Sequence, residues 1–249
     1  MRKIVTVICI GLVVVGSAFL LKNHLKRAEN VEIYESLQKE QESILGELEP
    51  TVTEDDLLQI PVDFEALKII NEDIYAWIDI EDTNVHYPIV QSATDDSYYL
   101  EHTIEGVKGL PGSIYTEKVN AKDFTDFNTL IYGHDMRDGS MFKHLHKFSD
   151  SEFFKEHDTI MIYTENAALE YRVYAAVVYD NRHIMYSYDN DDVDDCKSFI
   201  KSISEARNLK NQYREDMELD ENSKLITLST CITGQPDKRF LVVAELVEE

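Results

Sequence analysis

The sequence predicts a mixed β-barrel, and two observations support this fold class. From Trp77 onwards, many short apolar or alternating segments of strand length follow one another along the chain. A single long helical pattern, at 193–208, interrupts them before the last two strands. A βαβ sheet would instead alternate helices with strands, so the series favours a barrel.

The expected elements follow in chain order. A charged helix with a thin apolar stripe is expected at 31–48, where it would act as a stalk or pack loosely on the domain. Two prolines with an acidic cluster make 49–61 a linker. Asp63 is expected to cap a short helix that continues through Asn71. The stripe comprises Ile33, Leu37, Ile44, Leu45 and Leu48, and the short helix would place Phe64, Leu67, Ile70 and Ile74 on one face. The expected strands are 77–80, 85–90, 112–115, 128–132, 159–163, 169–179, 225–228 and 240–246.

An apolar run of 18 residues without charge, 4–21, lies close to the N-terminus. A bilayer requires roughly 17–25 such residues, and the cations Arg2 and Lys3 precede the run. Because Phe19, Leu20 and Leu21 extend it past a small-residue stretch, an uncleaved signal anchor is favoured over a cleaved signal peptide. We therefore expect a membrane anchor at 1–27, a helical stalk and linker at 28–61, and a folded domain at 62–249 outside the cytoplasm.

The charge is strongly negative, with 48 acidic residues against 24 Lys and Arg, which gives a formal net charge of -24. Residues 1–27 hold five of the cations and no acid, so the remainder is even more acidic. Sequence-independent nucleic-acid binding needs a basic face, and this composition argues against it. The aspartates between 189 and 195 lack the glycine and terminal glutamate of an EF-hand, so they are interpreted as a solvated loop that starts a helix.

Three cysteines are too few for a disulfide framework. Cys9 belongs to the apolar run, and Cys196 falls in the helix expected at 193–208. Cys231 follows the apolar strand 225–228 and is the candidate nucleophile. The sequence does not exclude a disulfide between Cys196 and Cys231.

Two further residues could complete a site with Cys231. His134 follows the strand expected at 128–132, and imidazole suits general acid–base work near neutral pH. Arg239 precedes the last strand and could stabilise an oxyanion. Taken singly, His134 could be a surface histidine and Arg239 a surface cation, but together with Cys231 they supply three different roles. The other histidines of this region (His144, His146, His157) are interpreted as solvated, without zinc-site spacing.

Together these residues resemble a class B sortase, a cysteine transpeptidase of Gram-positive bacteria. The match rests on TLSTC ending at Cys231, an arginine after a short loop at Arg239, and YGHDM around His134. The segments 77–100 and 140–154 are also similar to that family, so the resemblance covers about residues 62–249.

The resemblance implies a closed sortase β-barrel with N-terminal helices and a helix inserted before the last strands. It also implies that Cys231 attacks a carbonyl in the C-terminal sorting signal of an exported protein and forms a thioester. His134 would transfer protons, Arg239 would hold the carbonyl oxygen, and Ser229 and Thr230 would line the substrate groove. An amine of a peptidoglycan precursor would resolve the thioester, without a metal or an organic cofactor, and the enzyme would be single-pass in the cell membrane with its catalytic domain extracellular.

Two other interpretations compete with this one. A sortase-like membrane-anchored module could bind peptides without turnover. A papain-type peptidase usually places its cysteine before its histidine, whereas here His134 comes first. The order of the residues therefore disfavours the papain-type alternative.

Overall fold

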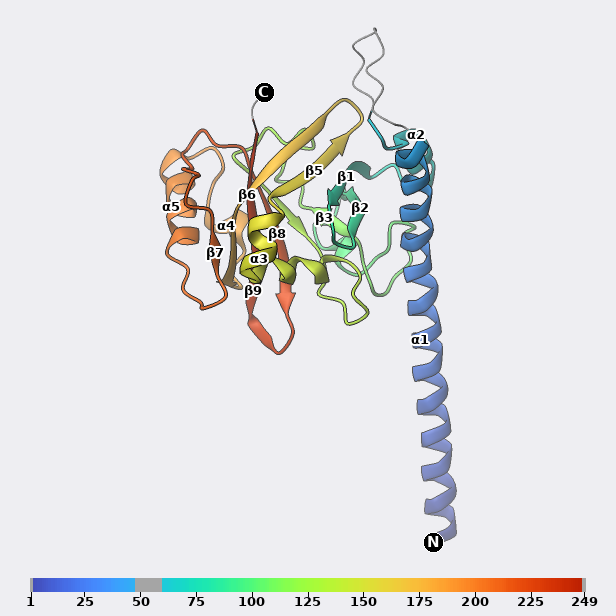
Figure 1. Cartoon of the computed structure of the whole chain (residues 1–249). Coiled ribbons are helices and arrows are strands. Elements are labelled where there is room, and N and C mark those ends of the chain that lie inside the picture. The colour runs from blue at the N-terminus through green and yellow to red at the C-terminus, as the bar shows by residue number, and fades with distance from the viewer. Residues whose placement is uncertain (1, 48–59, 248–249) are drawn as a thin grey trace.

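Eight strands close into a barrel, and a short ninth strand pairs outside the ring (Figure 1). The strands are β1 (Ile74–Ile80), β2 (Val85–Val90), β3 (Ile114–Thr116), β4 (Asn128–Tyr132), β5 (Thr159–Thr164), β6 (Ala168–Asp180), β7 (Gln212–Tyr213), β8 (Leu225–Ile232) and β9 (Gln235–Leu246). In the computed structural model, which describes residues 2–47 and 60–247, the ring order is β5-β1-β2-β3-β4-β8-β9-β6, and β6 pairs with β5 to close it. The pairs β2–β3 and β4–β8 are parallel and the other pairs are antiparallel, which confirms the expected mixed barrel.

Helices lie on two sides of this barrel. They are α1 (Arg2–Glu47), α2 (Phe64–Ile70), the 3₁₀ helices η1 (Tyr98–Leu100) and η2 (Phe142–Ser149), α3 (Ser151–Glu156), α4 (Ile184–Ser187) and α5 (Val193–Ser204). Figure 1 shows α1 along one side and α5 on the opposite side. The helices α2, α3 and α5 begin at Asp63, Asp150 and Asp192, whose carboxylates accept hydrogen bonds from backbone N–H groups of the first turn. The acidic loop at 189–195 thus starts a helix, as expected.

The C-terminal half of α1 packs against the barrel. Asn30, Tyr34, Leu37 and Gln41 are buried at helical spacing. The Tyr34 hydroxyl donates to the Gly112 carbonyl at 2.6 Å and accepts from the Ile104 N–H at 3.1 Å. Residues 30–41, part of the segment expected to act as a stalk or to pack loosely on the domain, are therefore docked on the barrel through buried contacts.

The expected membrane anchor at 1–27 requires a correction. Within the part of the chain that the structure describes, no helix has the length and apolar character needed to cross a bilayer. Residues 2–47 instead form one continuous helix, in which the apolar run leads directly into a polar segment that binds the barrel. Lys26 donates to the Lys108 carbonyl, and Arg27 pairs with Asp138 at 2.7 Å. The expected single-pass location in the cell membrane is wrong for the described residues.

Two apolar cores hold the domain together. The first fills the barrel, where large side chains such as Tyr171, Phe142 and Phe240 are fully buried. The second lies between α5 and the outer face of strands β4, β6, β8 and β9, and contains Cys196 and Phe199. This second core fixes the chain between β6 and α5 beside the outer face of the sheet.

The structure moves several expected boundaries. β9 begins at Gln235 rather than at 240, because its first residues are polar and extend beyond the apolar core. Ile74 starts β1 and does not continue the face of α2, while α5 ends at Ser204 instead of 208. The linker residues up to 59, and the side chains of Ile44, Leu45 and Leu48, lie outside the described residues.

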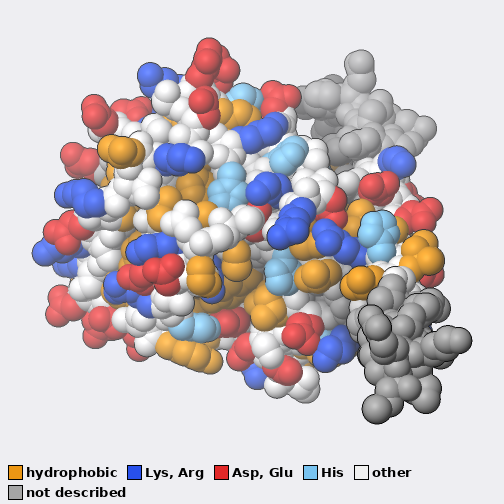
Figure 2. All heavy atoms as spheres, turned by 90° about the horizontal axis from the view of Figure 1, so that it is seen from below, with side chains coloured by type: hydrophobic (Ala, Val, Ile, Leu, Met, Phe, Trp, Pro, Cys, Tyr) orange, Lys and Arg blue, Asp and Glu red, His pale blue; other side chains and the backbone are white. Residues whose placement is uncertain are grey.

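Charged side chains of both signs share the surface. Figure 2, a view from below, shows Lys, Arg and His side chains interspersed with acidic ones on one face. On this face, positive and negative side chains lie next to one another.

Candidate active site

A pocket of about 620 Å³ opens on the outer face of β3, β4, β8 and β9. Cys231, His134 and Arg239 all line it, together with Ser229. Its remaining wall comes from the strand β3, from the segment 94–100 and from the segment around α4, which supplies His183 and Tyr186. The structure thus brings the three predicted reactive residues to one cavity.

Cys231 is exposed near the end of β8, directly opposite Arg239 in β9. A tight turn joins these two strands, and its Gly234 has a φ of +82°, which a glycine adopts without strain. Both cysteines of the described chain are free, so the bridge between Cys196 and Cys231 that the sequence left open does not form. Cys196 is buried in α5, and burial raises the pKa of its thiol.

His134 lies beside Cys231 because β4 runs parallel to β8. Tyr132 is paired with Ser229, and the Gly133 N–H donates to the Ser229 carbonyl at 3.1 Å. Only glycine fits at 133, since an added Cβ would lie 2.6 Å from the Phe142 ring. The Nε2 atom of His134 lies 2.8 Å from the Leu100 carbonyl oxygen, which can only accept, so Nε2 carries the proton and Nδ1 is left for proton exchange.

A second glycine supports the same histidine. Gly112 has a φ of +69°, and a Cβ there would lie 2.7 Å from the Leu100 carbonyl oxygen and 3.2 Å from the His134 ring. Any larger residue would displace the carbonyl that orients His134.

Arg239 keeps part of its hydrogen-bonding capacity free. Its Nη1 donates to the carbonyls of Lys238 at 2.8 Å and of Pro236 at 3.2 Å. These bonds hold the guanidinium next to the turn, and a guanidinium has further N–H donors on Nε and Nη2. The arrangement can therefore present fixed positive charge beside the thiol.

Beneath these residues, Asp135 joins the His134 segment to the β8–β9 turn. Its carboxylate accepts from the Thr233 N–H at 3.1 Å, from the Thr233 hydroxyl at 2.7 Å and from Lys143 Nζ at 2.8 Å. Burial opposes ionisation of Asp135, but these hydrogen bonds and the neighbouring His146 outweigh it and lower its pKa below the usual value. One carboxylate thus ties together the chain after His134 and the chain after Cys231.

His146, in η2, also contacts the backbone of the nucleophile. Its Nε2 donates to the Cys231 carbonyl at 3.2 Å, and its ring packs 4.9 Å from that of Phe240. Burial lowers the pKa of His146 more than the nearby carboxylate of Asp135 raises it. The sequence interpretation of His146 as a solvated helix or loop residue holds only in part, because it lies in η2 with a side chain that is half-buried against the backbone of the nucleophile.

The two predicted groove residues differ in orientation. Side chains alternate along a strand, so Ser229 shares the pocket face of β8 with Cys231, whereas the side chain of Thr230 points to the opposite face. Thr230 is buried, and its hydroxyl makes no hydrogen bond to any described residue. Both residues line the pocket, Ser229 from the face that the thiol occupies.

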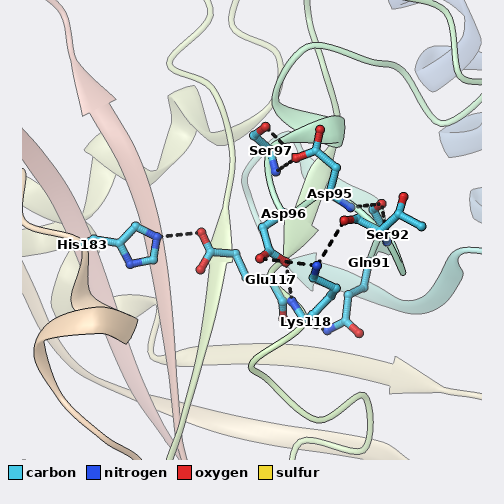
Figure 3. Close-up of polar contacts among 9 residues, drawn as sticks. Gln91, Ser92, Asp95, Asp96, Ser97, Glu117, Lys118 and His183 are labelled. Carbon is cyan, nitrogen blue, oxygen red and sulfur yellow. Dashed lines mark hydrogen bonds and ion pairs between the residues drawn. The ribbon is translucent and has the colours of Figure 1, made fainter.

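The opposite wall carries a polar cluster that the sequence reasoning missed (Figure 3). The Glu117 carboxylate faces the His183 ring, and Oε1 lies 2.8 Å from Nε2. Burial raises the pKa of Glu117, although His183 acts in the opposite direction. Beside this pair, the Lys118 N–H donates to Asp96 at 2.9 Å and Lys118 Nζ donates to the Thr94 carbonyl at 3.2 Å.

One sequence signal could have indicated Glu117. Tyr115 and Glu117 are two residues apart at the end of a strand, so they share the face that lines the pocket. His183, the partner of Glu117, lies 66 residues later in the chain, so no local sequence pattern indicates that the two residues meet.

Comparison with known proteins agrees with this geometry. The family described as Sortase domain matches residues 78–247. The sortase B of Listeria monocytogenes is 31% identical over 222 residues, which cover 86% of this chain and 87% of the relative. The sortase B of B. anthracis superposes with a TM-score of 0.71 at 30% identity, over 91% of this chain and 100% of that structure.

A further solved structure extends the comparison. A Streptococcus pyogenes class B sortase involved in pilus biogenesis has a TM-score of 0.65 at 29% identity, and the match covers 75% of this chain and 98% of that one. Family, relatives and barrel agree, and the chain belongs to the class B sortases, which are cysteine transpeptidases.

Proposed function

We propose that the chain cleaves the C-terminal sorting signal of exported proteins and transfers the resulting acyl group to an amine of a cell-wall peptide precursor. The observation that carries this proposal is the convergence of Cys231, His134 and Arg239 on one pocket large enough for several peptide residues. We assign the reaction to residues 62–249, with the docked half of α1 as a support.

In the first half of the proposed reaction, the Cys231 thiolate attacks the carbonyl carbon of the scissile amide. The oxygen becomes an oxyanion, and the free N–H groups of Arg239 stabilise it. When the C–N bond breaks, His134 donates a proton to the departing amine, and a thioester remains on Cys231. Ser229 and Thr230 line the groove along which the peptide lies.

In the second half, the incoming amine gives a proton to His134 and attacks the thioester carbon. The C–S bond breaks and the thiolate is restored, so protons and electrons balance over the cycle. The fixed contact between His134 Nε2 and the Leu100 carbonyl leaves Nδ1 as the atom that gives and receives this proton.

The test is cleavage of a pentapeptide library, followed by mass spectrometry with two acceptors, a peptide α-amine and a lysine ε-amine. The lysine acceptor is included because one similar class B sortase is involved in pilus biogenesis. The native protein should cleave a subset of peptides and form the new amide, whereas Cys231→Ala should do neither.

Cys196→Ala is the matched control, because it removes the buried thiol of α5, which does not line the pocket. It should retain transpeptidation. Undiminished cleavage by Cys231→Ala would refute the proposal, and peptide binding without acylation by the native protein would support the binding-module alternative instead.

A further inference from the structure

One face of α1 holds the loop between η1 and β3 (101–113) by a series of hydrogen bonds. Lys26, Asn30 and Tyr34 lie one helical turn apart, and each donates to a backbone carbonyl of this loop. The three acceptors, in the same order, are the carbonyls of Lys108 at 2.9 Å, Leu110 at 2.9 Å and Gly112 at 2.6 Å. Donors four residues apart on the helix thus match acceptors two residues apart in the loop.

Tyr34 makes the central contact of this series. Its side chain is only 3% exposed, and its hydroxyl also accepts from the Ile104 N–H at 3.1 Å, so one oxygen atom joins two parts of the loop. Burial raises the pKa of Tyr34 above its ordinary value, so the hydroxyl keeps its proton and donates it to the Gly112 carbonyl. Removal of this hydroxyl would leave two buried backbone groups without a partner.

The loop in turn fixes the carbonyl that orients His134. The N–H groups of Ser113 and Gly109 donate to the carbonyls on either side of Leu100, at 2.9 and 2.7 Å. The Leu100 carbonyl between them lies 2.8 Å from His134 Nε2. A Cβ at Gly112 would lie within 3.2 Å of both the Leu100 carbonyl oxygen and the His134 ring, so the backbone that Tyr34 holds packs directly on both groups.

The same tyrosine also supports the chain that follows His134. The ring of Tyr34 packs edge-on against that of Tyr87, with centroids 5.8 Å apart, and the Tyr87 hydroxyl accepts from the Met141 N–H at 3.0 Å. Met141 has a φ of +56°, which strains a residue other than glycine. The next N–H, that of Phe142, donates to the His134 carbonyl at 3.0 Å. Tyr87 thus holds a strained residue at the point where the chain returns to the histidine.

These contacts exceed what a covering helix needs. Apolar packing would be enough to cover the barrel, and Leu37 on the same face of α1 supplies it. Arg27 adds an ion pair with Asp138 at 2.7 Å, but both side chains are about a third exposed, and such pairs contribute little. The position of the histidine therefore depends most on the buried hydroxyl of Tyr34.

We propose that Tyr34 is a positioning residue for catalysis, and that the docking of α1 sets the orientation of the His134 ring through Gly112 and the Leu100 carbonyl. None of the described residues of α1 lines the pocket, so this role is exerted through the loop alone. The inference rests on the proposed function only where turnover is measured, because the orientation of the ring is a property of the free protein.

The first measurement records the His134 ring without peptide. Two-bond ¹H–¹⁵N correlation spectra are taken at about pH 8, above the usual histidine pKa, and the signal is identified by its absence in His134→Ala. In the native protein the proton should reside on Nε2, which faces the Leu100 carbonyl. Tyr34→Phe should show a mixture of the two neutral tautomers, because that carbonyl is no longer held in place.

The second measurement is steady-state kinetics with a peptide that the native protein cleaves. In Tyr34→Phe, kcat should fall about 5-fold, the factor that corresponds to one ordinary hydrogen bond. KM should change by less than about 2-fold, because the substituted side chain does not line the pocket that holds the peptide. A loss of stability alone would leave the folded protein in large excess and would move neither the tautomer nor kcat.

Two further variants complete the design. Gln41→Ala is the matched control, since Gln41 is buried on the same face of α1 but accepts from the Asp63 N–H, at the start of α2. It should leave the tautomer and kcat unchanged. Asn30→Ala removes the neighbouring bond to the Leu110 carbonyl, so it should act in the same direction as Tyr34→Phe and replaces it if that variant does not fold.

The outcomes separate this inference from the proposed function. An unchanged tautomer or an unchanged kcat in Tyr34→Phe would overturn the inference, and so would an equal effect of Gln41→Ala. If the tautomer shifts but the native protein joins no peptide to an amine, the positioning of His134 by α1 stands and the proposed reaction fails. If the native protein and Tyr34→Phe transpeptidate equally well, the reaction stands and the inference fails.

Discussion

The two ends of the pocket differ in how their polar groups are bonded. At the thiol end, which comprises Cys231, His134, Arg239 and the underlying Asp135, protein groups hold the ring of His134, the guanidinium and both sides of the β8–β9 turn. At the acceptor end, which comprises Glu117, Tyr132 and His183, each side chain has a buried polar atom that makes no short hydrogen bond to a described residue, and only a weak contact joins Tyr132 to the Glu117 carboxylate. Both ends occupy the same face of the same sheet.

The difference reflects what each end has to do. Covalent catalysis needs reacting groups held in a narrow range of positions, and hydrogen bonds from the protein supply that constraint. Recognition needs groups that are not yet satisfied, so that a matching ligand gains the interactions that the free protein lacks. The contrast therefore predicts opposite consequences when single polar groups are removed from the two ends.

The largest expected effect is the loss of proton transfer at the thiol end. His134→Ala should lower kcat for transpeptidation by roughly 10²–10⁴-fold, the usual contribution of a general acid–base group. His24→Ala is the matched control, since His24 is exposed on α1 and does not line the pocket. Steady-state kinetics should show a normal rate for the control, and a near-normal rate for His134→Ala would remove this histidine from the mechanism.

A smaller decrease in kcat is expected when Asp135, the residue that positions the thiol end, is replaced. Asp135→Ala would leave Lys143 and the Thr233 N–H without their shared acceptor, so the β8–β9 turn should loosen. We expect kcat to fall about 10-fold and the free energy of unfolding to fall by about 2 kcal/mol, as for a buried hydrogen bond to a charged group. Rate assays and urea unfolding measure the two effects.

Asp135→Asn provides the conservative comparison. Its amide oxygen can still accept from Thr233, although the charge facing Lys143 is lost, so it should recover part of kcat. An unchanged kcat in Asp135→Ala would show that the turn needs no anchor for the reaction.

Much of the thiol end could be predicted from the sequence. Cys231 and His134 each follow an apolar strand, and the parallel pairing of β4 with β8 brings such strand ends together. The register of Arg239 was harder to predict, because the polar residues that start β9 carry no apolar signal.

The acceptor end could not be found in this way. Glu117 and His183 meet only because the second core fixes the segment after β6 beside the sheet. Asp135 and His146 were missed for a related reason, because their partners lie far away along the chain. Asp135 accepts from the backbone N–H of Thr233, 98 residues later, and His146 donates to the carbonyl of Cys231, 85 residues later. Local sequence patterns therefore predict where strands end, but they do not predict which distant residues meet in the fold.

Two tyrosines sharpen the contrast in stability. Tyr34→Phe would remove a buried hydroxyl that satisfies the Gly112 carbonyl and the Ile104 N–H, so the free energy of unfolding should fall by about 1–3 kcal/mol. Tyr132→Phe would remove a hydroxyl whose contact with the Glu117 carboxylate is weak, so stability should change by less than about 0.5 kcal/mol or rise.

Urea unfolding of both variants measures this difference, because both substitutions are from Tyr to Phe and the rings remain. Equal destabilisation by the two variants would show that the Tyr132 hydroxyl is satisfied in the free protein, and the contrast between the two ends would fail.

The smallest expected effect is a pH dependence at the thiol end. Burial lowers the pKa of His146 in the folded protein, so the unfolded chain binds a proton more readily at that residue. Stability should therefore decrease as the pH falls through about 6.5, the usual histidine value, and should be restored above it. Because Nε2 of His146 holds the Cys231 carbonyl, this loss concerns the backbone of the nucleophile.

His146→Gln removes the titration while its amide N–H can still donate to that carbonyl. The free energy of unfolding, measured in urea at pH 7.5 and 5.5, should fall less in the variant than in the native protein. His144 and His157 also titrate in this range, but they are present in both proteins, so the difference isolates His146. An equal fall in both proteins would mean that His146 is as readily protonated in the folded state as in the unfolded chain, and that the thiol end is less tightly constrained than its hydrogen bonds indicate.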